Sequence, residues 1–287
     1  MFMALKIVHL DQKNWIELAR GYYGRAPELR KIAQKAVDRS QSGQIIFPLS
    51  ITHLSETLRN MNRERRQRLA RYMVLVSQGW AILPASTIIV PEIENACLKH
   101  LGLPRYDLQK FAIKKGMSQL LGAKADLVTK DPNKLPQHLK RQLLDRIESP
   151  ETLLWFVEQG VEHSKLRKMQ QDLVASTNKL QQIRSLDESQ IRDNDLRRRA
   201  TCAKYLVQVV NPEIIRFLLS VNVNPKVFAD QVFTDQENII RFFQSMPTSY
   251  CLVQLTLYRD MQRARRIQPN DLSDITSLSI AIPYSDV

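Results

Sequence analysis

Cysteine and long apolar runs are both scarce in this chain. Only three cysteines occur, at positions 97, 202 and 251, far apart and without the spacing of a zinc site. A disulfide framework is therefore not expected, and a reducing cytoplasm is the expected compartment. No apolar run approaches the ~20 residues that a membrane-spanning helix needs. The first residues also lack the charged region and small-residue cleavage site of a signal peptide.

Several catalytic signatures are missing as well. The eight glycines form no glycine-rich phosphate loop of the kind found in nucleotide-binding folds. The chain has no GxSxG and no HExxH motif, which leaves serine hydrolases and zinc proteases without support. The histidines at 100, 138 and 163 show no ligand spacing.

Basic residues, in contrast, are abundant. The 287 residues include 42 Lys and Arg against 29 Asp and Glu, a net charge of +13. This excess favours polyanionic partners, with nucleic acid ahead of an anionic membrane surface. A hydrophobic fraction of 44% is typical of a globular protein with a real core. The length suits one large domain, or one domain with a sizeable insertion.

The first 90 residues alternate short apolar runs with amphipathic segments. Residues 5–10, 44–47 and 80–85 are expected to be strands. The intervening segments are expected to be helices, over 14–40 with a break at Pro27, after a cap at Ser50 or Thr52, and over 63–78. Strand-helix units of this kind predict parallel strands joined by helical crossovers, and thus an α/β fold.

The rest of the chain has a different pattern. Residues 91 to about 266 are expected to be nearly continuous helix, cut into segments by prolines. Asp271–Ile282 is expected to form a further helix that leads through Pro283 into a new strand, on which the sequence stops.

Acidic side chains mark the predicted carboxyl edge of the sheet. Asp11 follows the first strand, Glu56 lies on the helix after the second, and Asp274 and Asp286 lie near the end of the chain. Functional sites of open parallel sheets lie outside the carboxyl ends of the strands. Converging carboxylates there would bind Mg²⁺ or Mn²⁺, and two such ions can support phosphodiester cleavage.

Three motifs in this order resemble the PIN-like nucleases. They are "IVHLDQKNW", "IIFPLSITHLSETL" and "DLSDITSLSIAIPYSDV". The resemblance implies a three-layer PIN-like core with a short parallel sheet over residues 1–90 and 248–287. Residues 91–247 would then be a large helical insertion or subdomain.

The resemblance also implies an activity. It is that of a nuclease that needs Mg²⁺ or Mn²⁺ and cleaves RNA in preference to DNA. Asp11, Glu56 and Asp274 match the first three acids of the family, with Asn14 placed to assist. Asp286 would stand in for a further acid, which the family usually supplies just after the fourth strand. A toxin or defence role would agree with such a nuclease by analogy.

Each acid also has an ordinary structural interpretation. Asp11 can cap the helix that follows it, and Glu56 alone would more often be a solvated helix residue. Asp271 is expected to cap the last helix, which leaves Asp274 for the metal. His9 and His53 are expected to be structural.

Phosphate binding is assigned to one of three basic clusters. The clusters are Arg63–Arg71, Arg197–Arg199 and Arg259–Arg266. The last precedes the Asp274 helix and supplies the candidate phosphate ligands Arg259, Arg263, Arg265 and Arg266. Stacking on bases is considered for Tyr22, Tyr23 and Tyr258, although aromatic residues at helical spacing are more often part of a core.

Two further functions stay open at this point. One is a nucleic-acid-binding protein that does not cleave, on a scaffold that has lost part of its acidic set. The other is a module whose helical middle binds a protein partner or a second copy of the chain. An additional acid just past Val287 would favour the enzyme over the binder.

Overall fold

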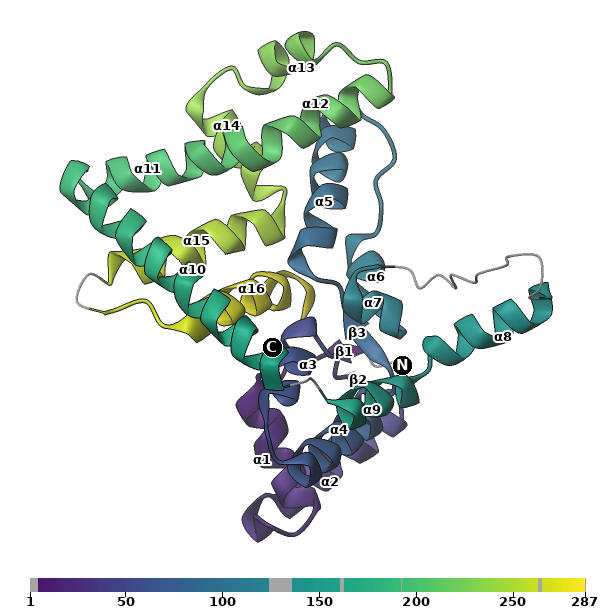
Figure 1. Cartoon of the computed structure of the whole chain (residues 1–287). Helices are drawn as coiled ribbons and strands as arrows, with labels where there is room; N and C mark the ends of the chain where they lie inside the picture. Colours follow the sequence, from purple (N-terminus) through teal and green to yellow (C-terminus); the bar gives the residue numbers. More distant parts are fainter. Residues whose placement is uncertain (1–4, 124–135, 161–162, 192, 263–264, 287) are drawn as a thin grey trace. The chain divides into compact units, whose positions relative to one another are not determined.

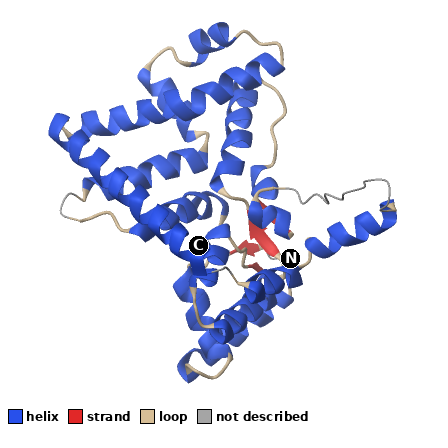
Figure 2. Ribbon diagram, in the orientation of Figure 1, coloured by secondary structure: helices blue, strands red, loops and turns tan. Residues whose placement is uncertain are grey.

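The chain is predominantly helical. The computed structural model describes residues 5–123, 136–160, 163–191, 193–262 and 265–286 (Figure 1). It is 75% helix and 4% strand, and the few strands are the red segments of Figure 2. The strands are β1 (Lys6–Ile7), β2 (Ile45–Ile46), β3 (Trp80–Ile82) and β4 (Ile113–Lys115).

The prediction of a three-layer α/β core is wrong, and the PIN-like resemblance is wrong with it. β1 pairs in parallel with β2, β3 pairs antiparallel with β4, and the two pairs are separate two-stranded sheets. One isolated parallel bridge, Leu49 with Ala81, adds to them. The apolar runs do lie where strands were expected, but each pairs over only two or three residues. Many apolar side chains of these runs are instead packed in the helical core of the first unit.

The prediction of a final strand is also wrong. The last helix, α16 (Pro269–Tyr284), continues through Pro283, and residues 285 and 286 after it have no regular structure. Asp286 instead pairs with β1. Its backbone N–H donates to Ile7 O at 2.7 Å, and its Oδ2 accepts the Ile7 N–H at 2.7 Å.

The chain divides into two compact units, each formed from several stretches of sequence. The first unit comprises Met1–Pro84, Gln109–Leu166 and Tyr284–Val287, and the second comprises Ala85–Leu108 and Arg167–Pro283. No helix in the described ranges combines the length and apolar character that a membrane crossing requires.

The first unit packs its helices around aromatic side chains. Trp15 and Tyr72 are fully buried and meet edge to face, with ring centroids 6.3 Å apart. The Tyr72 hydroxyl donates to Ala33 O at 3.1 Å, so its polar end is satisfied inside the core. The helices are α1 (Gln12–Tyr22), η1 (Pro27–Leu29), α2 (Arg30–Gln41), α3 (Ile51–Arg59), α4 (Arg63–Ser77), α7 (Met117–Leu121), α8 (Gln137–Ile147) and α9 (Pro150–Gln159), with α6 (Leu108–Ala112) at the boundary.

The second unit has its own core. Ile93, Leu218, Phe228 and Phe242 are among its fully buried side chains. Glu92 is buried with them, and its carboxylate accepts the Thr248 N–H at 2.9 and 3.0 Å. The helices are α5 (Ala85–His100), α11 (Asn194–Tyr205), η3 (Leu206–Val210), α12 (Asn211–Ser220), α13 (Pro225–Val232), α14 (Gln236–Gln244) and α15 (Pro247–Met261), together with most of α10 (His163–Gln190) and of α16.

Candidate functional site

Two of the four expected metal ligands hold backbone groups. Asp11 is the N-cap of α1, and its Oδ1 accepts the Asn14 N–H at 2.7 Å. Asp286 accepts the Ile7 N–H. Asp11 therefore has the capping role that its structural interpretation predicts, whereas Asp286 binds the backbone of β1.

The other two expected ligands lie on different units. Glu56 is half-buried on α3 in the first unit, whereas Asp274 is exposed on α16 in the second. Within the described part of the chain, no group of three or more His, Cys, Asp or Glu is arranged to hold a metal ion. The Mg²⁺ or Mn²⁺ site therefore stays a prediction.

His53, near the start of α3, is a buried structural residue. Its Nδ1 accepts the Ser50 N–H at 3.0 Å, so Nε2 carries the proton and donates to Leu10 O at 2.8 Å. The ring stacks on His9 with centroids 5.1 Å apart. Burial, and secondarily His9, lowers the pKa of His53 to about 3. The ring is therefore neutral, and it ties the start of α3 to the segment before α1.

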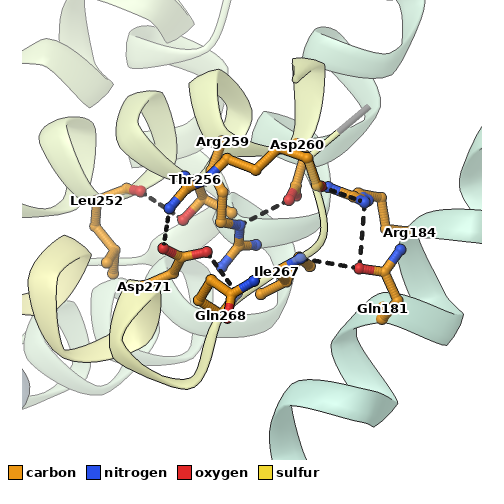
Figure 3. A network of polar contacts seen from close by, with 10 residues as sticks. Gln181, Arg184, Leu252, Thr256, Arg259, Asp260, Ile267, Gln268 and Asp271 are labelled. Carbon is orange, nitrogen blue, oxygen red and sulfur yellow. Dashed lines mark hydrogen bonds and ion pairs between the residues drawn. The ribbon is translucent and has the colours of Figure 1, made fainter. Parts of the chain in front are cut away.

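The C-terminal basic cluster is engaged in internal contacts (Figure 3). Arg259 is buried, and its Nε donates to Asp260 at 2.8 Å. Arg265 pairs with Asp271 at 2.5 Å, while its carbonyl accepts a bond from Arg184 at 2.8 Å. Asp271 also accepts the Gln268 N–H at 2.8 Å, in agreement with a capping role. Of the remaining candidates, Arg266 is exposed and Arg263 lies outside the described residues.

A different arginine cluster lines a groove in the first unit. The groove has a volume of about 460 Å³ and lies between α1, the turn that follows it, the α3–α4 turn and α4. Four of its lining residues are arginines and none is acidic. The lining residues are Ile16, Ala19, Arg20, Tyr23, Arg25, Asn60, Arg65, Arg68 and Leu69.

The turn after α1 brings two of these arginines together. Gly24 adopts a left-handed φ of 76°, which returns the chain toward the helix. The Arg25 N–H then donates to Arg20 O at 2.8 Å. Gly21 allows the next segment to pass close by, because a Cβ at this position would lie 2.8 Å from Leu29 Cβ.

The α3–α4 turn places the other arginines. Asn62 caps α4 by accepting the Arg65 N–H at 2.9 Å, and Asn60 Oδ1 accepts the Asn62 N–H at 3.1 Å. The side chain of Arg66 donates to Asn60 O at 2.7 Å and holds the turn. The start of α4 thus lies at the groove, where its helix dipole adds to the positive potential.

Most of the arginine charge in the groove is uncompensated. Arg68 forms an ion pair with Glu64, one turn earlier on α4. Arg20, Arg25 and Arg65 are exposed, and no described carboxylate lies within ion-pair distance of them. Such a concentration of guanidinium groups attracts anions and can bind phosphate through two parallel hydrogen bonds.

The groove also has an apolar part. Ala19 and Leu69 are buried, while Ile16 and Tyr23 are 40% and 38% exposed. Burial, together with Tyr22, raises the pKa of Tyr23, with Arg71 and Arg68 opposing the shift. Tyr23 is therefore a neutral phenol at pH 7, within electrostatic reach of two arginines. The arrangement can bind an anion that carries a flat, weakly polar group.

The sequence pattern pointed to two of the four arginines of this groove, without assigning them a role. Arg65 and Arg68 belong to the basic run at 63–71, which was considered and ranked below the C-terminal cluster. Arg20 and Arg25 were missed because they are single arginines on either side of a turn. The stretch "ARGYYGR", in which two arginines flank two glycines and two tyrosines, was the available signal.

Known proteins give no further guide to this groove. No family model, no curated protein and no solved structure matches the chain.

Proposed function

We propose that this protein binds nucleic acid, and that the arginine groove of the first unit holds the phosphates. The observation that carries this proposal is a concave surface lined by four arginines and no carboxylate. Arginine is the side chain best matched to phosphate geometry. The net charge of +13 adds long-range attraction for a polyanion.

Other polyanions are less well matched to the groove. Acidic peptides and anionic lipid surfaces would satisfy the arginines but make no use of an exposed aromatic ring. Nucleic acid supplies both phosphates and flat bases, and aromatic side chains commonly stack on bases. The lining of Tyr23, Ile16 and Leu69 therefore favours nucleic acid.

The test compares two charge-matched triple variants. Arg20→Gln/Arg25→Gln/Arg65→Gln removes the unpaired arginines of the groove. Arg30→Gln/Arg141→Gln/Arg146→Gln removes three exposed arginines elsewhere in the first unit. Fluorescence anisotropy with labelled RNA and DNA oligonucleotides, over a series of salt concentrations, measures affinity and its salt dependence.

The groove variant is expected to bind at least about tenfold more weakly. Its slope of log K against log salt should be smaller by about 2, since each lost phosphate contact removes about 0.7 for a single strand. The control variant should keep most of the affinity. Equal losses in both variants would contradict a localised site.

Two further results would overturn the proposal. One is no binding of RNA or DNA by the wild type at low salt. The other is tighter binding of polyglutamate or of phosphatidylserine vesicles than of any oligonucleotide, which would assign the groove to an acidic protein or to a membrane surface.

A further inference from the structure

We infer that the groove selects unpaired nucleotides, with one base stacked on the ring of Tyr23 and the neighbouring phosphates on the arginines. This inference rests on the proposed nucleic-acid binding and specifies the form of nucleic acid that is bound.

The first argument is the position of Tyr23 beside the charge. Its ring lines the same groove as Arg20, Arg25 and Arg65. In a single strand, each base is one sugar away from its phosphate. A ligand whose phosphate contacts the arginines therefore brings a base within reach of the ring. In a duplex the faces of the bases are stacked on each other, and only phosphates and groove edges are presented.

The second argument is that the ring of Tyr23 packs on other aromatic rings that connect it to the core. Tyr23 meets Tyr22 edge to face at 5.2 Å, and Tyr22 packs on Tyr72 at 5.3 Å. Tyr72 is anchored in the core by its bond to Ala33 and its contact with Trp15. Only one neighbouring ring contacts Tyr23 among the described aromatic side chains, and it occupies at most one of the two faces. An anchored ring loses little conformational entropy when a base stacks on it.

The third argument is the size and lining of the groove. A volume of about 460 Å³ is within the range of pockets that hold a single small ligand. Its apolar residues, Ile16, Ala19 and Leu69, offer a surface for a flat base rather than for additional phosphates. The arginines and the apolar residues together match one nucleotide, with further contacts to the adjoining backbone.

The experiment compares single strands with duplexes of the same sequence and uses two variants of one residue. Tyr23→Phe keeps the aromatic ring. Tyr23→Leu removes the ring but keeps an apolar side chain. A single strand that carries 2-aminopurine reports stacking through quenching of its fluorescence. Affinity for the single strand and for the duplex, and the salt slope, are measured for all three proteins.

The single strand is expected to bind about tenfold more tightly than the duplex at equal salt, with quenching on binding. Tyr23→Leu should weaken single-strand binding about 5- to 150-fold and abolish the quenching. It should leave duplex affinity and the salt slope unchanged, because the arginines are intact. Tyr23→Phe should stay within about threefold of the wild type, since the stacking surface is retained.

Three results would overturn the inference while leaving nucleic-acid binding in place. They are equal affinity for single strand and duplex, an unchanged affinity of Tyr23→Leu for the single strand, and an equal loss for both ligands in that variant. Absence of binding to either ligand by the wild type would instead overturn the proposed function.

Discussion

At the scale of single residues, three of the acids singled out in the sequence act as acceptors for backbone N–H groups. Asp11, Asp286 and Asp271 each accept one such bond at a helix start or a strand edge. A carboxylate beside the N-terminus of a helix is stabilised both by the hydrogen bond and by the helix dipole. For Asp11, capping of α1 explains why an acid follows an apolar run.

Asp11 allows the capping and metal roles to be separated. Asn and Asp cap helices about equally well, whereas Ala does not cap. Asp11→Asn should therefore unfold like the wild type in urea, and Asp11→Ala should lose about 1 kcal/mol.

Cleavage of labelled RNA and DNA with Mn²⁺ tests the nuclease prediction on the same proteins. If cleavage occurs, is abolished by EDTA and disappears in the normally stable Asp11→Asn variant, Asp11 is a metal ligand as well as a cap. Cleavage that persists in both Asp11 variants would exclude that role.

His53 makes the stability of the first unit dependent on pH. Burial holds its pKa at about 3 in the folded protein, well below the value of about 6.5 in an unfolded chain. Between these values the unfolded state binds a proton that the folded state does not, so stability falls as the pH decreases below 6.5. His9, whose pKa burial lowers to about 4, acts in the same direction.

We expect each of these two histidines to cost about 2 kcal/mol of stability when the pH is lowered from 7 to 5. Urea unfolding of the wild type and of His53→Gln at both pH values measures the drop. The variant should be less stable at pH 7 and should show the smaller drop. Equal drops would mean that His53 is not held neutral by the fold.

At the scale of elements, the groove depends on how closely the segment after α1 packs against that helix. A methyl group at Gly21 would lie 2.9 Å from the backbone of Leu29, so η1 would have to move. Gly21→Ala should destabilise the protein by about 1–3 kcal/mol. It should also weaken nucleic-acid binding, because the displaced turn carries Arg25.

Gly43→Ala is the matched control for this change. A Cβ at Gly43 meets nothing within 4 Å, but the φ of 68° still disfavours alanine. It should cost about 1 kcal/mol through backbone strain alone and leave the binding affinity unchanged. Thermal unfolding and anisotropy on both variants distinguish strain from displacement.

Local sequence patterns predicted the helices better than the strands. Helical periodicity, the break at Pro27, the Ser50 cap and the stop at Gly79 correctly located α1 to α4. Short apolar runs predict strands over their whole length, because periodicity does not distinguish a strand from a buried connection. In the run 5–10, only Lys6 and Ile7 pair, while Val8 and Leu10 pack on the helical core.

The groove was harder to predict than the helices that form it. A run of arginines on one helix can be read from the sequence, as for Arg65 and Arg68. The convergence of Arg20 and Arg25 depends on the left-handed turn at Gly24. Their convergence with α4 depends on tertiary packing, which no local pattern encodes.

At the scale of the whole molecule, the two units have separate cores and should respond separately to core substitutions. Glu92 is buried in the second unit and accepts bonds from the first turn of α15. Glu92→Ala removes the acceptor from those N–H groups and should cost about 2–3 kcal/mol.

Hydrogen exchange should detect this loss in the second unit, with protection retained around Trp15 and Tyr72. Nucleic-acid affinity should be unchanged, because the groove belongs to the first unit. Loss of affinity in Glu92→Ala would show that the groove depends on the second unit. Glu92→Gln keeps one acceptor oxygen and should be affected less.

The order of the two units along the chain has a consequence for proteolysis. The chain passes from one unit to the other between residues 84 and 85, 108 and 109, 166 and 167, and 283 and 284. A single cut between residues 108 and 109 leaves parts of both cores on each fragment. Neither fragment would carry a complete core, so the two halves of a nicked protein should stay together as a non-covalent complex and separate only on unfolding.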